Sequence, residues 1–253
     1  MIALVGAGNV ATWIARRLRN NVDFPVCRVY SRSLSNAHVL ANMVGAEPID
    51  DIHALNPHCD AYLLALRDDC YQEVLPQIPF KMNLALLTAG TLSQNILAPY
   101  AQRYGVVYPL QTFSKNMSFH DLNVPLCIES SQLMEQKTSV YHLAGILSDE
   151  VYEVDENKRF TLHLAAVFAS NFSNAMVAIA AQILHDKGLS LKMLYPLLQN
   201  TAAKWQSMSP ADAQTGPARR NDLNVMQRHL EELNDEELKK IYQLVSEYIR
   251  KHS

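Results

Sequence analysis

The chain opens with the feature that most constrains its fold, a glycine loop that joins a strand to a helix. A short apolar run, Ile2–Val5, is followed by Gly6-x-Gly8-x-x-Ala11 and then by residues that favour a helix. Gly6 allows the tight turn, Gly8 has no side chain to keep a pyrophosphate from the backbone, and the small Ala11 lets the helix pack close to the strand. The pattern therefore predicts a dinucleotide-binding α/β unit.

The start of that helix completes the predicted phosphate site. The backbone amides of Asn9 and Val10 would face the phosphates, where the helix dipole favours negative charge. A glycine-rich turn that binds no ligand is the alternative interpretation of the same residues.

Strands and helices alternate through the first part of the chain. The strand-like segments that follow the first are Pro25–Tyr30, Asp60–Leu66, Leu84–Thr88, Val106–Tyr108, Pro125–Glu129 and Val151–Val154. Helix-like segments lie between them, including Leu92–Tyr104, which Gly105 ends. Apolar strands that alternate with helices are typical of a mostly parallel sheet covered on both faces. The expected fold class is α/β, a Rossmann-type mostly parallel sheet followed by an all-helical carboxyl-terminal domain.

The remainder of the chain has helical patterns only. We place a boundary near residue 156, between a nucleotide-binding domain, 1–156, and a helical substrate and dimerisation domain, 157–253. Leu164–Leu184 carries no charged residue, so a membrane span is one interpretation of it. Asn171 and Asn174 near its middle would be costly in lipid, and we therefore expect a helix that is buried in protein and no membrane partner.

The end of the second strand indicates which dinucleotide would bind. An acidic residue there would hold the 2′-hydroxyl of the ribose, but the chain has Ser31, Arg32 and Ser33 instead. The guanidinium of Arg32 can pair with a 2′-phosphate, and both serines can donate hydrogen bonds to it. We therefore expect NADP as the cofactor, with a solvated Arg32 as the alternative.

The carboxyl ends of the other parallel strands should border the ribose and the nicotinamide, because ligands bind at this edge of open parallel sheets. Leu66 and Thr88 end two of these strands, and we assign them to the cofactor. Gln111 follows a later strand and is a candidate for binding a small-molecule substrate. Ordinary turn chemistry is the alternative for each, and Asp68 and Asp69 are interpreted as helix-starting residues.

Composition excludes several classes of partner. A net charge of -3, from 22 basic and 25 acidic residues, gives no electrostatic case for binding nucleic acid or an anionic membrane. The 4 cysteines form no C-x-x-C pair, and we expect no metal site. Free thiols in a reducing compartment are expected, with a disulfide framework as the alternative. No basic segment precedes the first apolar run, so we expect no targeting peptide and a cytoplasmic protein.

Several segments together make the chain similar to a known group of proteins. They are GAGNVA, YSRS, YPLQTF, HLAAVFASNF and TGPARRND. The chain resembles bacterial Rossmann-like proteins, described as NADP oxidoreductases, in which a helical domain of uncharacterised function follows the nucleotide-binding domain. These proteins are similar to pyrroline-5-carboxylate reductase and to the 3-hydroxyacid and 6-phosphogluconate dehydrogenases. The resemblance covers nearly the whole chain, and it implies that the first helix of the second domain faces the nicotinamide and that the helical domains pair in a homodimer.

That helix carries the candidate catalytic residues His163, Asn171 and Asn174. His163 is a candidate proton donor because histidine changes charge near neutral pH, and the two asparagines are candidates for contacting the substrate or the ribose. In a regular α-helix His163 and Asn174 would lie about 20° apart around the axis but roughly 16 Å apart along it. A structural histidine and helix–helix hydrogen bonds of the asparagines are the alternatives.

Two further observations concern the substrate. Arg220 could clamp a carboxylate through two hydrogen bonds or reach across a dimer, and a solvated arginine is the alternative. In the hydroxyacid dehydrogenases that the chain resembles, a helix lysine is followed one turn later by asparagine, whereas here Lys158 is followed one turn later by Leu162. This difference disfavours hydroxyacid oxidation and leaves the reduction of a carbonyl or an imine.

The sequence thus predicts an NADP-dependent oxidoreductase that transfers hydride between nicotinamide and a small carbonyl or imine compound. A non-catalytic NADP-binding sensor or regulator is the second hypothesis, because the sequence assures no acid–base dyad. A nucleotide-free helical dimer module is the third, and the intact glycine loop disfavours it.

Overall fold

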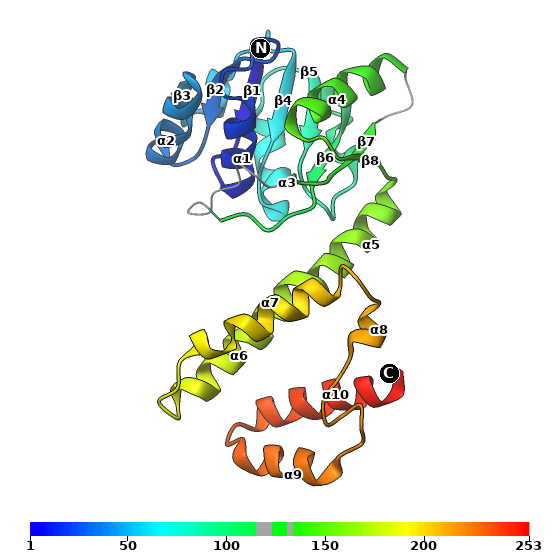
Figure 1. Cartoon of the computed structure of the whole chain (residues 1–253). Helices are drawn as coiled ribbons and strands as arrows, with labels where there is room; N and C mark the ends of the chain where they lie inside the picture. Colours follow the sequence, from blue (N-terminus) through cyan, green and yellow to red (C-terminus); the bar gives the residue numbers. More distant parts are fainter. Residues whose placement is uncertain (115–122, 131–133, 253) are drawn as a thin grey trace. The chain divides into compact units, whose positions relative to one another are not determined.

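The computed structural model of the chain consists of two compact units, Met1–Asn174 and Ala175–Ser253. The structure describes residues 1–114, 123–130 and 134–252. Strands occur in the first unit, and the described part of the second is helical (Figure 1).

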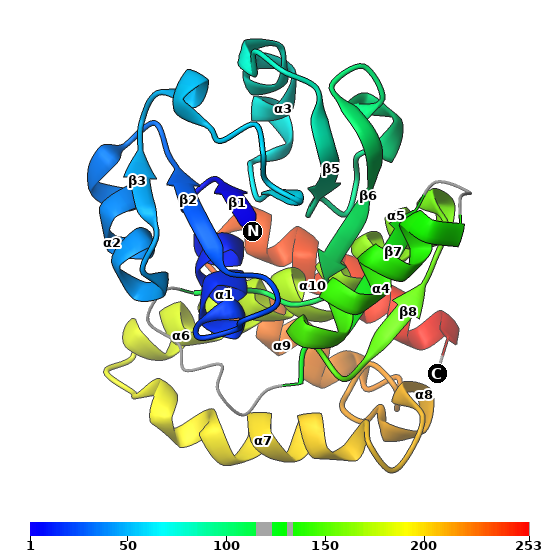
Figure 2. The ribbon, with the colours of Figure 1, turned by 90° about the horizontal axis from the view of Figure 1, so that it is seen from above.

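The first unit is built on an eight-stranded sheet in the order β3-β2-β1-β4-β5-β6-β7-β8, and Figure 2 shows these strands from above. The strands are β1 (Ile2–Val5), β2 (Val26–Tyr30), β3 (Glu47–Ile49), β4 (Ala61–Leu64), β5 (Met82–Leu87), β6 (Ala101–Pro109), β7 (Leu126–Ser130) and β8 (Val151–Glu153). Neighbours from β3 to β6 pair in parallel, β7 runs antiparallel to β6, and β8 is parallel to β7. The first six strands have the Rossmann order, which confirms the expected fold class.

Helices cover both faces of this sheet (Figure 2). On one face lie α1 (Asn9–Leu18), α2 (Leu34–Val44) and α4 (Met134–Leu147), and on the other lies the short α3 (Tyr71–Val74). A helix on each face is what continuous apolar strands require, because both sides of the sheet must be removed from water.

The side chains of β1 alternate between two hydrophobic clusters, one on each face of the sheet. Ile2 and Leu4 pack in the same cluster as Trp13 of α1. Ala3 and Val5 pack in the other cluster, which contains Tyr71 of α3. Successive side chains of a strand point to opposite faces of the sheet, which produces this alternation. Both faces of β1 are therefore buried, and its carboxyl end lies in the middle of the unit.

The expected helix over Leu92–Tyr104 is wrong. The structure has only a short 3-10 helix at Gln94–Leu97, and the strand β6 begins at Ala101. Pro99 follows the short helix and cannot continue it, and the next residues pair with β5, where Ala101 lies opposite Met82.

One long helical run begins in the first unit. It consists of α5 (Glu156–Ala166), a π-helical turn (Val167–Phe172) and α6 (Ser173–His185). The boundary expected at residue 156 coincides with the end of the strands, whereas the first compact unit continues to Asn174. The difference arises because α5 packs against the sheet through Arg159, which is fully buried.

The same run is the part of the described chain that could cross a membrane by length and composition. The helical run spans Glu156–His185, and its most apolar window has a mean hydropathy of 1.6. The expected burial of this helix in protein is wrong, because none of the apolar window is buried among the described residues. Asn171 and Asn174 lie near the middle of the run. Because unpaired amides are costly in lipid, the run is not evidence for a membrane protein.

Among the described residues, the second unit contains most of α6 and four further α-helices. They are α7 (Tyr195–Lys204), α8 (Pro210–Ala213), α9 (Leu223–Glu232) and α10 (Glu236–His252). A hydrogen bond of 2.9 Å between the His229 ring and the Tyr242 hydroxyl joins α9 to α10. Ala218 is the one apolar residue of this unit that is buried among the described residues, so the unit has almost no hydrophobic core of its own.

Candidate functional site

The glycine loop has the geometry that its sequence predicts. Gly6 adopts φ +113°, which side chains other than glycine rarely tolerate. A Cβ atom at this position would lie 2.3 Å from the carbonyl oxygen of Ala65. The amide of Gly6 donates a 2.8 Å hydrogen bond to the carbonyl of Tyr30. The loop is therefore held between the ends of β2 and β4, and only glycine fits at its first position.

The space in front of helix α1 is open. A Cβ atom at Gly8 would meet no other atom within 4 Å. Gly8 provides no side-chain cap, the first turn of α1 has no acidic residue, and the amides of Asn9 and Val10 have no acceptor among the described residues. Unpaired amides at a helix start attract phosphate, so these residues fit the pyrophosphate of a dinucleotide.

The end of β2 presents one positive side chain. The guanidinium of Arg32 is exposed and lies 3.8 Å from the carboxylate of Glu73, an exposed pair that contributes little. The hydroxyl of Ser33 accepts a hydrogen bond from the amide of Asn36 as the N-cap of α2, and the Ser31 hydroxyl accepts one from the Ser33 amide. Both serine oxygens serve the local turn, so Arg32 is the principal group available to a 2′-phosphate.

The residues expected at the ends of β4 and β5 differ in their surroundings. The side chain of Leu66 borders the glycine loop, 3.5 Å from where a Cβ atom of Gly6 would lie. Thr88 is buried, and its amide and hydroxyl both donate to the carbonyl of Leu64, at 3.3 Å. Leu66 is thus next to the predicted phosphate site, whereas the Thr88 side chain joins β5 to β4.

At the carboxyl edge of the sheet, Tyr108 at the end of β6 contacts His163 of α5. The Tyr108 hydroxyl lies 3.2 Å from Nδ1 of His163. A Cβ atom at Gly90 would lie 2.9 Å from the Tyr108 ring and 3.0 Å from the histidine, so only glycine allows the pair to approach this loop. Burial raises the pKa of Tyr108, and the nearby Asp68 carboxylate contributes to the rise. The phenol therefore stays protonated near neutral pH.

Asp68 connects two neighbouring strand ends. Its carboxylate accepts a short hydrogen bond from the Thr91 hydroxyl. Asp68 follows β4 and Thr91 follows β5. Asp68 begins a short 3-10 helix, as expected, and it also adds a negative charge close to Tyr108.

A buried ion pair holds helix α5 against the sheet. Arg159 is fully buried and pairs with the carboxylate of Glu129 at the end of β7. Its guanidinium also donates to the carbonyl of Leu92. Arg159 lies one helical turn before His163, so this contact sets where the histidine ring lies.

Sequence reasoning identified His163 but missed Tyr108 and Arg159 as parts of the site. Tyr108 ends the predicted strand before Pro109, and its place at a carboxyl edge was the available signal. Arg159 is four residues before His163, so a cation on the same helix face was visible too.

The two candidate asparagines lie in a different setting from the histidine. Asn171 is within the π-helical turn and Asn174 is in the first turn of α6, and both are exposed. The π turn adds a residue to the helix, so the 20° separation expected between His163 and Asn174 does not hold. π turns are frequent at functional sites, and the catalytic assignment of the asparagines stays a prediction.

The two candidate substrate residues belong to different units. Gln111 is exposed in the first unit, where its side-chain oxygen accepts a 2.8 Å hydrogen bond from the amide of Thr112. Arg220 is exposed in the second unit, in a turn that Arg219 holds by donating to two backbone carbonyls. Among the described residues the Arg220 side chain has no hydrogen-bond or ion-pair partner, so it is available to an anion.

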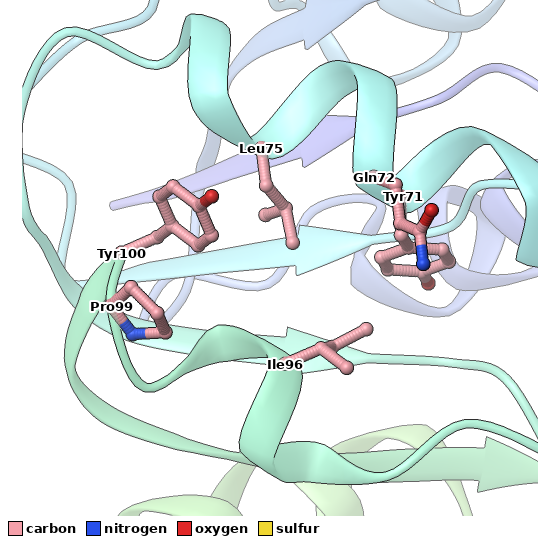
Figure 3. Close-up of a pocket in the computed structure, with 6 residues that line it drawn as sticks. All are labelled: Tyr71, Gln72, Leu75, Ile96, Pro99 and Tyr100. Carbon is pink, nitrogen blue, oxygen red and sulfur yellow. The ribbon is translucent and has the colours of Figure 1, made fainter.

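A pocket of about 220 Å³ lies elsewhere on the first unit (Figure 3). Its lining consists of Tyr71, Gln72, Leu75, Ile96, Pro99 and Tyr100. None of these is charged, and the volume is below the usual range of ligand pockets. In the part of the chain that the structure describes, no cluster of three potential metal ligands occurs. The carboxyl edge with the glycine loop is therefore the candidate site.

Comparison with known proteins agrees with this geometry. A family described as a domain of unknown function, DUF2520, matches residues 124–249. The solved structure of a putative NADP oxidoreductase from Bacteroides fragilis is 38% identical in sequence, covers 99% of this chain and 97% of its own, and has a TM-score of 0.92. The chain belongs to this family. This chain combines a Rossmann-like unit with a helical carboxyl-terminal region, as the sequence predicts.

Two reductases of known structure share the fold at lower identity. A 1-pyrroline-5-carboxylate reductase from Streptococcus pyogenes is 17% identical, with 99% and 98% of the two chains covered and a TM-score of 0.66. An imine reductase from Myxococcus stipitatus in complex with NADP+ is 15% identical, with 99% and 92% covered and a TM-score of 0.62. None of the curated protein sequences matches the chain.

Proposed function

We propose that the protein is an NADP-dependent oxidoreductase that transfers hydride between nicotinamide and a small carbonyl or imine compound. The observation that carries this proposal is that the open glycine loop and the Tyr108–His163 pair lie at the same carboxyl edge of one sheet. Such an edge is where open α/β sheets bind their ligands.

The cofactor would be held by the groups already described. The amides of Asn9 and Val10 would bind the pyrophosphate, and Leu66 would border it. The guanidinium of Arg32 would pair with the 2′-phosphate, with Ser31 and Ser33 beside it. The relatives named with NADP support this choice of dinucleotide. When bound, the reduced cofactor supplies the hydride.

The chain itself would supply the proton. Because burial raises the pKa of Tyr108, the phenol keeps its proton and can donate it to a nitrogen or oxygen of the substrate. The ring of His163, 3.2 Å away, can orient the hydroxyl and return a proton to it. Positioned acids of this kind contribute about 100-fold to 10,000-fold in rate.

The chain offers several polar groups that would hold the substrate. Gln111, Asn171 and Asn174 are the neutral candidates, and Arg220 is the candidate for binding a carboxylate. Lys158 does not take the role of the helix lysine in the hydroxyacid dehydrogenases, because it is exposed and pairs with Asp155 at 3.1 Å. This supports reduction of a carbonyl or imine over oxidation of a hydroxyacid.

The test has two stages. Titration with NADPH and NADH should give the lower dissociation constant for NADPH, and Arg32→Ala should remove that preference. A screen for NADPH oxidation with keto acids and cyclic imines should then find turnover, which Tyr108→Phe should reduce about 100-fold or more in kcat. Tyr104→Phe, on the same strand, is the matched control.

The outcomes separate the competing functions. Tight NADPH binding with no turnover on any substrate would favour a non-catalytic sensor. Absence of binding to either dinucleotide would contradict the oxidoreductase proposal altogether. Equal activity of Tyr108→Phe and the unaltered protein would remove Tyr108 from the proposed chemistry but leave the cofactor site intact.

We also propose that the helical unit pairs with a second copy of the chain. The described part of this unit buries almost no apolar side chain, and Trp205, Leu244 and Tyr248 are exposed. Exposed apolar side chains on this scale mark interaction surfaces. A homodimer through the helical unit would cover them, which agrees with what the sequence resemblance implies.

We propose the cytoplasm as the location. The 4 cysteines are free thiols, and free thiols persist in a reducing compartment. Detection of the protein in a compartment that forms disulfides would contradict this.

A further inference from the structure

Two cysteine thiols meet at the amino ends of the strands, on the edge opposite the glycine loop. The sulfur of Cys27 in β2 lies 3.1 Å from the sulfur of Cys59, which precedes β4. Cys59 is buried and Cys27 is partly exposed. The two residues are 32 positions apart in the chain, so the fold alone brings them together.

An irregularity in the sheet directs Cys27 toward this contact. In the pairing of β1 with β2, Ile2 lies opposite Val26 and the next residue, Ala3, lies opposite Arg28. Cys27 is therefore an additional residue in β2, a β-bulge. Bulges redirect side chains, and the Cys27 thiol is also 3.3 Å from the carbonyl of Ile2. Because β1 separates β2 from β4, the two thiols meet across the end of β1.

The two thiols differ in acidity. A hydrogen bond from the Cys59 thiol lowers the pKa of Cys27 to about 7, although burial opposes this. The pKa of Cys59 is raised, first by that same hydrogen bond and then by burial. The charged groups nearest the pair are Arg28, Asp60 and the amino group of Met1. The thiolate is the nucleophile in thiol–disulfide exchange, so Cys27 is the attacking thiol and Cys59 its protonated partner.

We propose that Cys27 and Cys59 form a reversible thiol–disulfide site that exchanges with low-molecular-weight disulfides. In the first step the Cys27 thiolate attacks one sulfur of the small disulfide, forms a mixed disulfide and releases one small thiolate. In the second step the Cys59 thiol loses its proton and attacks the Cys27 sulfur, which closes the protein disulfide and releases the second small thiol. The protein loses two electrons and two protons, and the small disulfide gains them.

The remaining cysteines are natural controls for this site. Cys70 follows β4 at the opposite edge, and Cys127 is buried in β7. Burial raises the pKa of Cys127. Neither has a second sulfur as hydrogen-bond partner among the described residues, so neither can close an intramolecular disulfide in the folded state.

The test uses the full chain and glutathione. Reduced protein is incubated with increasing ratios of oxidised to reduced glutathione, quenched in acid, and labelled with N-ethylmaleimide under denaturing conditions. The expected result is a fall from four labels to two, with peptide mapping that joins Cys27 to Cys59. Cys59→Ser should instead accumulate glutathione on Cys27, and Cys70→Ser should behave like the unaltered protein.

Two results would overturn the proposal. One is retention of all four labels at high oxidised glutathione while the folded protein is intact by circular dichroism. The other is a disulfide that includes Cys70 or Cys127, or one that forms equally well in denaturant. Because the site lies at the edge away from the glycine loop, oxidation should raise the Tm without changing NADPH affinity, which keeps this test independent of the proposed activity.

Discussion

Two glycines of one loop serve different purposes at the residue scale. Gly6 is required by the fold, because it has a positive φ and no room for a Cβ atom. Gly8 has φ -83° and open space in front of it. The absence of a side chain at Gly8 is therefore required for ligand binding and not for folding.

Substitution by alanine should separate these purposes. Gly6→Ala should lower the free energy of unfolding by at least about 1–2 kcal/mol, the cost of placing a residue with a Cβ atom in this backbone region. Gly8→Ala should change it by less than about 1 kcal/mol but weaken NADPH binding, because the methyl group occupies the phosphate space. Thermal unfolding and calorimetric titration measure the two effects. A stable Gly6→Ala protein would contradict the role given to Gly6.

The acidity of Cys27 gives a prediction about pH. The reactive form is the thiolate, so the rate of alkylation by iodoacetamide at Cys27 should rise as the pH increases through about 7. Cys59→Ala removes the hydrogen-bond donor that stabilises this thiolate and should move the midpoint upward. Mass spectrometry of the Cys27 peptide follows the rate, and the Cys127 peptide is the control because burial raises its pKa. A midpoint near that of an ordinary cysteine in the unaltered protein would contradict the assignment.

The residues of the site show what a sequence can reveal at this scale. The glycine loop and Arg32 follow from local spacing, because each residue acts through its own backbone or its own charge. The contact of Tyr108 with His163 joins residues 55 positions apart. No local pattern specifies such a pair, so His163 could be proposed without its partner.

At the scale of elements, helix α5 depends on one buried ion pair. Arg159 is completely removed from water and Glu129 nearly so. Removal of one partner leaves an uncompensated charge in the interior. Glu129 therefore contributes to holding α5 in place, together with His163 on that helix.

Glu129→Gln should destabilise the first unit by about 3–5 kcal/mol, the usual effect of breaking a buried pair. Glu129→Leu combined with Arg159→Leu should cost less than Glu129→Leu alone, because no buried charge remains. Lys158→Ala breaks the neighbouring exposed pair with Asp155 and should have little effect. Urea unfolding measures the four variants and the unaltered chain. Equal stability of Glu129→Gln and the unaltered chain would show that the pair does not anchor α5.

The elements also show why part of the fold was not predictable. The strands β1 and β4 are continuous apolar runs, and β2 and β5 are apolar except for Arg28 and Asn83, so their local pattern is sufficient. The start of β6 at Ala101 lies within a stretch of mixed pattern, and its pairing with β5 decides its conformation. The strand β3 has only the residues Glu47–Ile49, too few to show a period.

At the scale of the whole molecule, the two units differ in how they exclude water. The first has two hydrophobic clusters on its sheet. The second exposes apolar side chains on α6, α7 and α10. A helical unit with so little buried apolar surface would gain too little from folding alone, so its stability should depend on a partner.

Sedimentation should therefore find a particle of twice the 28.5 kDa mass of the chain. Leu244→Glu places a charge at an exposed apolar position of α10 and should shift the equilibrium to the monomer. Gln243→Glu adds the same charge at the neighbouring polar position and is the matched control. A monomer in the unaltered protein at all accessible concentrations would contradict the homodimer.

The π turn at Val167–Phe172 has a consequence for how the chain tolerates changes in length. A deletion inside a regular α-helix rotates every later residue by about 100° about the axis. A π turn already contains one residue more than the α-helical path needs. Deletion of one residue here would restore regular helix and leave Arg159 and the apolar positions of α6 in their present phase. This segment is thus the place in the long helical run where evolution could shorten the chain without reorienting its faces.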